Sequence, residues 1–112
     1  MAHTCFLSGL EIPKGKYSRE HLAPRSKVPP EISQQADNIK PSIKIFNYIK
    51  GDRFLCQWEE QKYGLVFYAY NNWNLKPIDK QLLRQALNGM PKIDACEHCI
   101  CNIYKEYCIK QR

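Results

Sequence analysis

The chain has 112 residues and a hydrophobic fraction of 44%, which is the size and composition of a single globular domain. Its 17 Lys and Arg residues outnumber its 11 Asp and Glu residues, so the net charge is +6. No apolar run approaches the roughly 18 residues that a membrane span needs, and the first residues lack the pattern of a signal peptide. These features exclude a membrane-spanning, collagen-like or coiled-coil chain. We expect one cytoplasmic domain over residues 1–112.

The excess of positive charge is concentrated in one part of the chain. Residues 13–53 hold nine basic and four acidic side chains, so five of the six net charges lie there. Such a concentration favours a polyanionic partner such as nucleic acid. A basic, solvated surface that keeps the protein soluble explains the charge equally well.

The first part of the chain is predicted to consist of loops and short strands, because five of the seven prolines precede residue 42. Pro13 and Gly15 form a turn signal, and the strand expected over residues 17–23 makes this region a predicted hairpin. Residues 27–38 have neither helical nor strand periodicity. We expect them to form an ordered loop.

The first predicted helix follows this loop. Ser42 is expected to cap it, and Gly51 is expected to end it, because glycine takes the left-handed backbone conformation that closes many helices. At helical spacing Ile45 and Ile49 share the apolar side, and Asn47 points away from them. The helix therefore presents a polar amide.

Three more helices are predicted towards the end of the chain. Asp52 is expected to cap one that passes through Trp58, although its apolar run over residues 65–70 also suits a buried strand. Pro77 is expected to begin another, which ends before a glycine. Residues 94–109 are predicted to form the last.

Three short segments carry a pattern of residue types associated with nucleic-acid cleavage. They are REHLAPRS at residues 19–26, DNIKPS at residues 37–42 and FNYIKGD at residues 46–52. Together they resemble the core of the HNH endonucleases, in which an acidic residue and a His are followed by a Pro, an Asn and a final Asn or His on a helix. The matching positions here are Glu20, His21, Pro24, Asn38 and Asn47. The Lys-Gly-Asp that often follows the last ligand is matched by residues 50–52.

The resemblance implies a fold and an activity. The fold is α+β, with a small ββα-metal (His-Me finger) hairpin-plus-helix core over residues 5–53 and additional C-terminal helices over residues 54–112. The activity is hydrolysis of DNA, most often duplex DNA, with one Mg²⁺ or Mn²⁺ ion. His21 is then the general base, Glu20 and Asn47 hold the metal, and the amide of Asn38 bonds backbone so that the histidine is correctly aimed.

These residue types also suit the chemistry on physical grounds. Hydrolysis of a phosphodiester needs a base near neutral pH, which His21 can supply. The side-chain oxygens of Glu20 and Asn47 suit Mg²⁺ or Mn²⁺. Neighbours on a regular strand point to opposite faces, so Glu20 and His21 need a strand end or a bulge to reach one phosphate. The basic residues expected to bind DNA phosphates are Arg19, Arg25, Lys27, Lys44, Lys50 and Arg53.

The sequence departs from the family pattern in two respects. Glu20 stands where Asp is commonest, and a longer side chain moves the carboxylate outward. Many members also bind a structural zinc ion with two Cys-x-x-Cys pairs, whose places here are taken by Cys5, Ser8, Ile43 and Phe46. We expect apolar packing to replace that metal.

The end of the chain is rich in cysteine. Cys96 and Cys99 have the spacing of zinc ligands. On a continuous helix, however, Cys101 and Cys108 lie on the opposite side, so the sequence favours buried helix cysteines over a metal site. The alternatives are a redox role and a structural zinc site in which Cys96 and Cys99 are joined by either Cys5 or His98.

Two other functions stay open at this stage. One is a catalytically inactive nucleic-acid-binding module of the same fold, which is favoured if Glu20 cannot hold the ion. The other is a small zinc-stabilised interaction protein whose cysteine-rich end is the working part.

Overall fold

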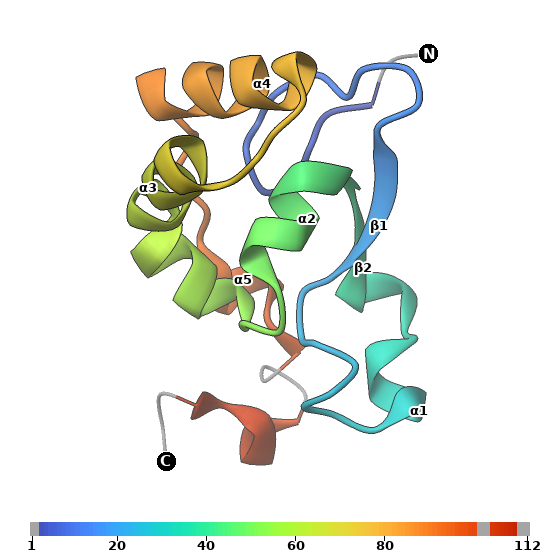
Figure 1. Ribbon diagram of the computed structural model, residues 1–112. Coiled ribbons are helices and arrows are strands. Elements are labelled where there is room, and N and C mark those ends of the chain that lie inside the picture. Colours follow the sequence, from blue (N-terminus) through green and yellow to red (C-terminus); the bar gives the residue numbers. More distant parts are fainter. Residues whose placement is uncertain (1–2, 101–103, 110–112) are drawn as a thin grey trace.

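A two-stranded antiparallel sheet lies against a series of helices in the computed structural model, which describes residues 3–100 and 104–109 (Figure 1). The elements in chain order are β1 (Tyr17–His21), α1 (Pro30–Ser33), η1 (Ala36–Asn38), β2 (Ile39–Ile43), α2 (Lys44–Lys50), α3 (Leu55–Asn72), α4 (Pro77–Asn88), α5 (Ala95–His98) and η3 (Lys105–Tyr107). The protein is therefore a small α+β domain, as predicted. No described helix is both long and apolar enough to cross a membrane.

The strand predicted over residues 17–23 is present as β1 but ends two residues earlier, and its predicted partner is wrong. It pairs with β2, in a register that places Tyr17 opposite Ile43 and His21 opposite Ile39. The turn after Pro13 does form, yet the segment before it contributes only an isolated bridge between Thr4 and Glu11. The predicted local hairpin is therefore wrong, and the sheet is closed by a longer connection.

That connection contains more structure than the predicted loop. Residues 27–38 include α1 and η1, each about one turn long. Pro30 stands at the start of α1, where a missing N–H costs no hydrogen bond. The segment brings Asn38 to the start of β2.

The helix α2 packs on both strands and against α3. Its predicted end is confirmed, since Gly51 follows the last residue with a φ of 60°. Its predicted cap is wrong. Ser42 belongs to β2, where its Oγ lies 3.0 Å from that of Ser18, and Ile43 stands at the N-cap.

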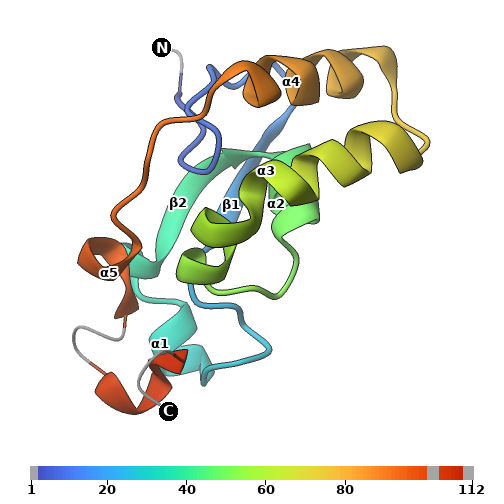
Figure 2. The ribbon, with the colours of Figure 1, turned by 90° about the vertical axis from the view of Figure 1, so that its left-hand side faces the viewer.

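The long predicted segments after Gly51 are helical. α3 runs unbroken through residues 65–70, so the alternative of a buried strand is wrong. Asp52 does not cap it. Phe54 stands at the N-cap position, and its backbone N–H donates to Oε1 of Gln57 at 2.8 Å. α4 begins at Pro77 as predicted and packs against α3 (Figure 2).

The continuous helix predicted over residues 94–109 is wrong. Asp94 caps a helix, with Oδ1 accepting from the N–H of Glu97, but α5 ends at His98. Cys99 has an extended backbone, with φ −75° and ψ 137°. The short η3 lies further along, and residues 101–103 lie outside the described part of the chain. The helical faces expected for these cysteines therefore do not exist.

The core lies between the sheet, α2, α3 and α4. Its largest fully buried apolar side chains are Trp58, Phe46, Leu7, Leu22, Ile43, Leu55, Leu83 and Val66. The four positions that replace the family's zinc ligands, Cys5, Ser8, Ile43 and Phe46, are all buried. Sγ of Cys5 accepts the N–H of Ile43 at 3.3 Å, so this place is occupied by side-chain packing.

Candidate active site

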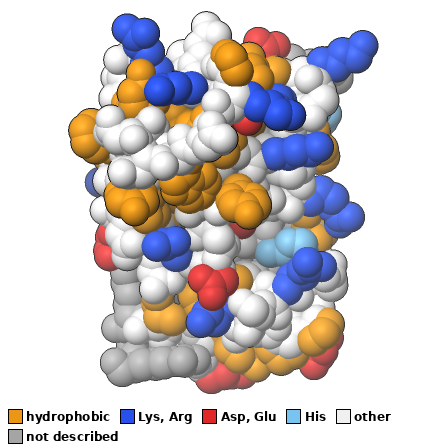
Figure 3. All heavy atoms as spheres, in the orientation of Figure 1, with side chains coloured by type: hydrophobic (Ala, Val, Ile, Leu, Met, Phe, Trp, Pro, Cys, Tyr) orange, Lys and Arg blue, Asp and Glu red, His pale blue; other side chains and the backbone are white. Residues whose placement is uncertain are grey.

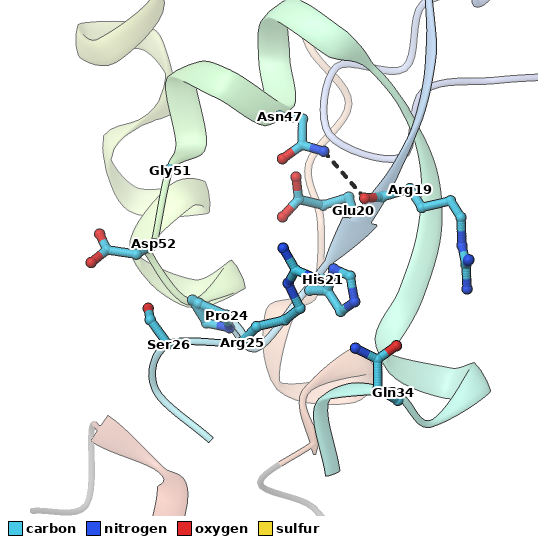
Figure 4. A pocket seen from close by; sticks show the side chains of 10 residues that line it. All are labelled: Arg19, Glu20, His21, Pro24, Arg25, Ser26, Gln34, Asn47, Gly51 and Asp52. Carbon is cyan, nitrogen blue, oxygen red and sulfur yellow. Dashed lines mark hydrogen bonds between the residues drawn. The ribbon is translucent and has the colours of Figure 1, made fainter. Parts of the chain in front are cut away.

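A pocket of about 600 Å³ opens where β1 ends, beside the turn that follows α2 (Figure 4). It is lined by Arg19, Glu20, His21, Pro24, Arg25, Ser26, Gln34, Asn47, Gly51 and Asp52. β1, the loop after it, the residue that follows α1 (Gln34), and α2 all contribute residues to this pocket. Its volume is in the usual range of ligand sites, which is about 300–1,000 Å³.

His21 is the last residue of β1, so the strand end that the chemistry requires is present. Its Nε2 atom is buried and has no hydrogen-bond partner among the residues that the structure describes. Burial, then the positive charge of Arg25, lowers the pKa of the imidazole below its ordinary value of 6.5, and a hydrogen bond with Gln34 opposes this shift. A neutral imidazole has one nitrogen that can accept a proton. The ring is therefore suited to act as a base at neutral pH.

Glu20 is paired with Lys50 inside the protein. Nζ of Lys50 lies 2.9 Å from Oε1 of Glu20 and donates to the carbonyl oxygen of His21 at 3.1 Å. Burial raises the pKa of Glu20, and the charge and hydrogen bond of Lys50 partly oppose this. Burial also lowers the pKa of Lys50, against the opposing effect of Glu20. The lysine holds the last two residues of β1 against α2.

This pairing corrects the role expected for Lys50. Its side chain is 0% exposed, so it does not reach a phosphate outside the protein. Lys50 stands one helical turn after Phe46, which is also buried, so the two side chains share the inner side of α2. The second carboxylate oxygen of Glu20, Oε2, is buried and lacks a hydrogen-bond partner among the described residues.

Asn38 ties the two ends of the connection together. Its Oδ1 accepts the N–H of Ala23 at 2.8 Å, and its Nδ2 donates to the carbonyl oxygens of Ala23 and Ser33 at 3.0 and 2.9 Å. These are bonds to backbone, of the kind expected for this residue. They also explain why β1 stops at His21, since both backbone groups of Ala23 are taken by a side chain rather than by a strand.

Asn47 extends from α2 towards the sheet. Its Nδ2 donates to Oγ of Ser18 and to the carbonyl oxygen of Arg19, both at 3.2 Å. In Figure 4 its amide lies beside the carboxylate of Glu20. Because the amide nitrogen is used for these bonds, the carbonyl oxygen is the atom that Asn47 can offer to a ligand.

Two of the basic residues expected at phosphates line the pocket, namely Arg19 and Arg25, and both are exposed. On the face shown in Figure 3, Lys and Arg side chains border a histidine. Lys27 and Lys44 are also exposed but do not line the pocket. Nζ of Lys27 lies 3.8 Å from the carboxylate of Asp52.

Arg53 is half-buried and engaged with the protein. Its Nη1 donates to the carbonyl oxygen of Lys50 at 3.2 Å, and its Nε donates to Oε1 of Gln61 at 3.2 Å. It therefore braces the turn between α2 and α3. These two bonds use Nε and Nη1, and Arg53 does not line the pocket.

The zinc ligands considered from the sequence are not assembled. Cys5 lies in the core against β2, whereas Cys96 and Cys99 belong to α5 and its end. His98 packs edge-on against the ring of Phe6, with the centroids 5.0 Å apart. Within residues 3–100 and 104–109, no three Cys, His, Asp or Glu side chains form a group that holds a metal in this conformation.

Sequence reasoning missed part of the pocket lining. Gln34 approaches the imidazole of His21 from the segment between α1 and η1, and no pattern in that segment indicated it. Ser26 and Asp52 also line the pocket. They belong to the matched segments REHLAPRS and FNYIKGD, so the resemblance itself was the available signal.

The pocket suits a hard divalent ion with few protein ligands. Oε2 of Glu20 is buried without a partner among the described residues, and the carbonyl of Asn47 lies near it. Mg²⁺ typically binds through one or two protein oxygens and keeps several waters. Lys50 occupies only the other oxygen of Glu20. The donor set therefore fits such an ion.

Comparison of the chain with protein-family models, with curated proteins and with solved structures finds no match.

Proposed function

We propose that this protein is an HNH-type endonuclease, with a ββα-metal core over residues 5–53, that hydrolyses DNA phosphodiester bonds. One observation carries the proposal. Nε2 of His21 and Oε2 of Glu20 belong to side chains that line the same pocket, and both atoms are buried without a partner in the described structure. Buried polar atoms are normally satisfied, so two such atoms on side chains of one pocket favour a site that binds a further group.

Several residues of the pocket have separate roles in this reaction. Arg19 and Arg25 hold the phosphate at the mouth of the pocket. Neutral His21 takes a proton from the attacking water, which is the role of a general base. Glu20 and Asn47 would hold a divalent ion, which supplies the positive charge that stabilises the pentacoordinate phosphorane.

Incubation of supercoiled plasmid with the protein tests this proposal. We expect cleavage with Mg²⁺ or Mn²⁺ and none with EDTA. His21→Ala should lower the rate about 10²–10⁴-fold, which is the usual contribution of a general base. His3→Ala is the matched control, because His3 is exposed and does not line the pocket. Equal rates for His21→Ala and the wild type would refute the mechanism.

A second candidate is a nucleic-acid-binding module without turnover. The ion pair favours it, because Lys50 already neutralises the carboxylate that would bind the metal. Fluorescence anisotropy with the same duplex separates the two functions. Binding that depends on Arg25, together with no cleavage in either metal, would identify the inactive module.

A further inference from the structure

Four of the chain's six cysteines line one small cavity at a distance from the candidate active site. Cys56 comes from the first turn of α3, Cys96 and Cys99 come from α5 and its end, and Cys108 comes from the residue after η3. The cavity is lined by Phe54, Cys56, Ala95, Cys96, Cys99, Tyr107, Cys108 and Ile109. The start of α3 and the end of the chain, which are about forty residues apart in sequence, thus contribute thiols to one place.

We propose that Cys56, Cys96, Cys99 and Cys108 form a structural zinc site. Zn²⁺ in structural sites is held almost always by four ligands in a tetrahedron, and four thiolates are one of its common ligand sets. The remaining side chains around the cavity are aliphatic or aromatic. Cys56 is buried, Cys99 and Cys108 are half-buried and Cys96 is exposed, so the ion would lie near the surface with apolar side chains on its inner side.

The space in the cavity fits a single ion. It measures about 10 Å³, which is close to the smallest volume that holds one water molecule, roughly 10–15 Å³. The described side chains do not yet form a group of three or more metal ligands. Binding therefore requires the thiols to turn inwards and lose their protons to solvent.

The backbone supports the arrangement because the chain leaves the helix between the two central cysteines. Cys96 is in α5, and Cys99 has an extended conformation with ψ 137°. A continuous helix would have sent Cys108 to the opposite side from Cys96. The break after His98 removes that obstacle, and η3 returns the chain so that Cys108 borders the same cavity as Cys96.

The segment that contains these cysteines is built from very short elements. α5 has four residues and η3 has three, and neither is long enough to be stable alone. Its anchors to the rest of the protein include buried Ala95 and Ile100 and the bond from Gln35 to the hydroxyl of Tyr104 at 2.8 Å. A metal bound here would join this segment to the start of α3 by coordinate bonds.

Metal analysis of the 112-residue protein, purified under reducing conditions and supplied with zinc, tests the proposal. We expect one zinc ion per chain. Cys56→Ala and Cys108→Ala should each lower the affinity for zinc by at least tenfold. Cys5→Ala is the matched control, since Cys5 is as buried as Cys56 but lies against β2, and it should bind zinc like the wild type.

A measurement on the wild-type protein guards against variants that fail to fold. Co²⁺ added to the reduced, metal-depleted protein should produce the intense sulfur-to-cobalt charge-transfer absorption of four thiolate ligands, and zinc should abolish it. A reduced protein that binds neither ion would overturn the proposal. Zinc retained by both Cys56→Ala and Cys108→Ala, or lost equally from Cys5→Ala, would also overturn it. None of these readouts depends on nuclease activity.

Discussion

The buried ion pair between Glu20 and Lys50 makes a quantitative prediction about stability. Both side chains are almost fully buried, at 2% and 0% exposure, so removal of the lysine leaves a carboxylate inside the protein without its counter-ion. Loss of one partner of a buried pair costs about 3–5 kcal/mol. The carbonyl oxygen of His21 also loses its donor, which costs about 1 kcal/mol more. We expect Lys50→Met to lower the free energy of unfolding by about 4–6 kcal/mol.

Urea denaturation at pH 7, followed by tryptophan fluorescence, measures this loss because Trp58 is in the core. Lys44→Met is the matched control, since Lys44 is an exposed lysine of the same helix, and its effect should stay within about 0.5 kcal/mol. The double variant with Glu20→Gln should recover much of the stability, because no charge is then left buried. A loss below about 1 kcal/mol for Lys50→Met would refute the reasoning, as it is typical of exposed pairs.

The same variant should depend on pH in a defined direction. Burial raises the pKa of Glu20 above its ordinary 4.5, and Lys50 opposes the shift, so removal of the lysine raises this pKa further. A carboxyl with a raised pKa contributes stability that is present below pH 4.5 and is lost as the pH rises through the folded-state pKa. The cost of Lys50→Met should therefore be smallest near pH 4.5 and grow towards pH 7. A cost that decreases over this range would contradict the assignment.

Three further outcomes follow from the pocket. Because the pKa of His21 is lowered, the acidic limb of kcat/KM for plasmid cleavage should have its midpoint below pH 6.5, and a midpoint above that value would exclude His21 as the base. Asn38→Ala should destabilise the fold by about 2–4 kcal/mol in urea denaturation, because it leaves backbone groups of Ala23 buried and unsatisfied. Arg25→Ala should reduce the slope of log affinity for duplex DNA against log salt by about 0.9, equally for unrelated sequences, and an unchanged slope would remove Arg25 from the phosphate contacts.

Local signals were sufficient for much of the fold. Pro77 and the glycines at positions 51 and 89 mark helix ends that the structure reproduces, because backbone conformation at these residues depends little on distant contacts. The strand over Tyr17–His21 was also predictable from its residues. Its pairing with β2 was not, since pairing is decided by contacts across a long connection that leave no periodic trace.

The cysteine-rich end shows a different limit. Residues 94–109 have spacing compatible with one helix, yet the helix stops at His98. Apolar residues at helical spacing favour a helix only where a partner surface runs along the whole face. Here Ala95 and Ile100 are buried but the following residues, as far as the structure describes them, turn back in η3. The cavity with four cysteines results from this tertiary arrangement and could not be predicted from helical periodicity.

The candidate site was predictable as a set of residue types and not as a network. Glu20, His21 and Asn47 line one pocket, as the motif required. Lys50 was assigned to phosphate because a lysine in a basic segment usually faces solvent. Its burial depends on Glu20, which lies on another element and offers a carboxylate at 2.9 Å. Pairings between elements of this kind are decided by the fold and cannot be obtained from spacing alone.

The ion pair links the stability of the domain to the chemistry proposed for it. Lys50 fixes one oxygen of Glu20 and the backbone of His21, so the other oxygen, Oε2, and the imidazole are held on the same pocket. A pocket without this lysine would leave the carboxylate able to rotate, and a carboxylate without an ordered orientation is a poorer ligand for a cation that demands regular geometry. The lysine also lowers the negative charge available to that cation. Lys50 therefore affects metal binding in two opposite ways, by ordering the carboxylate and by neutralising its charge. A titration of Mn²⁺ into Lys50→Met below its unfolding temperature separates the two effects. Tighter binding than in the wild type means that the charge of Lys50 dominates, and weaker binding means that its ordering of the carboxylate dominates.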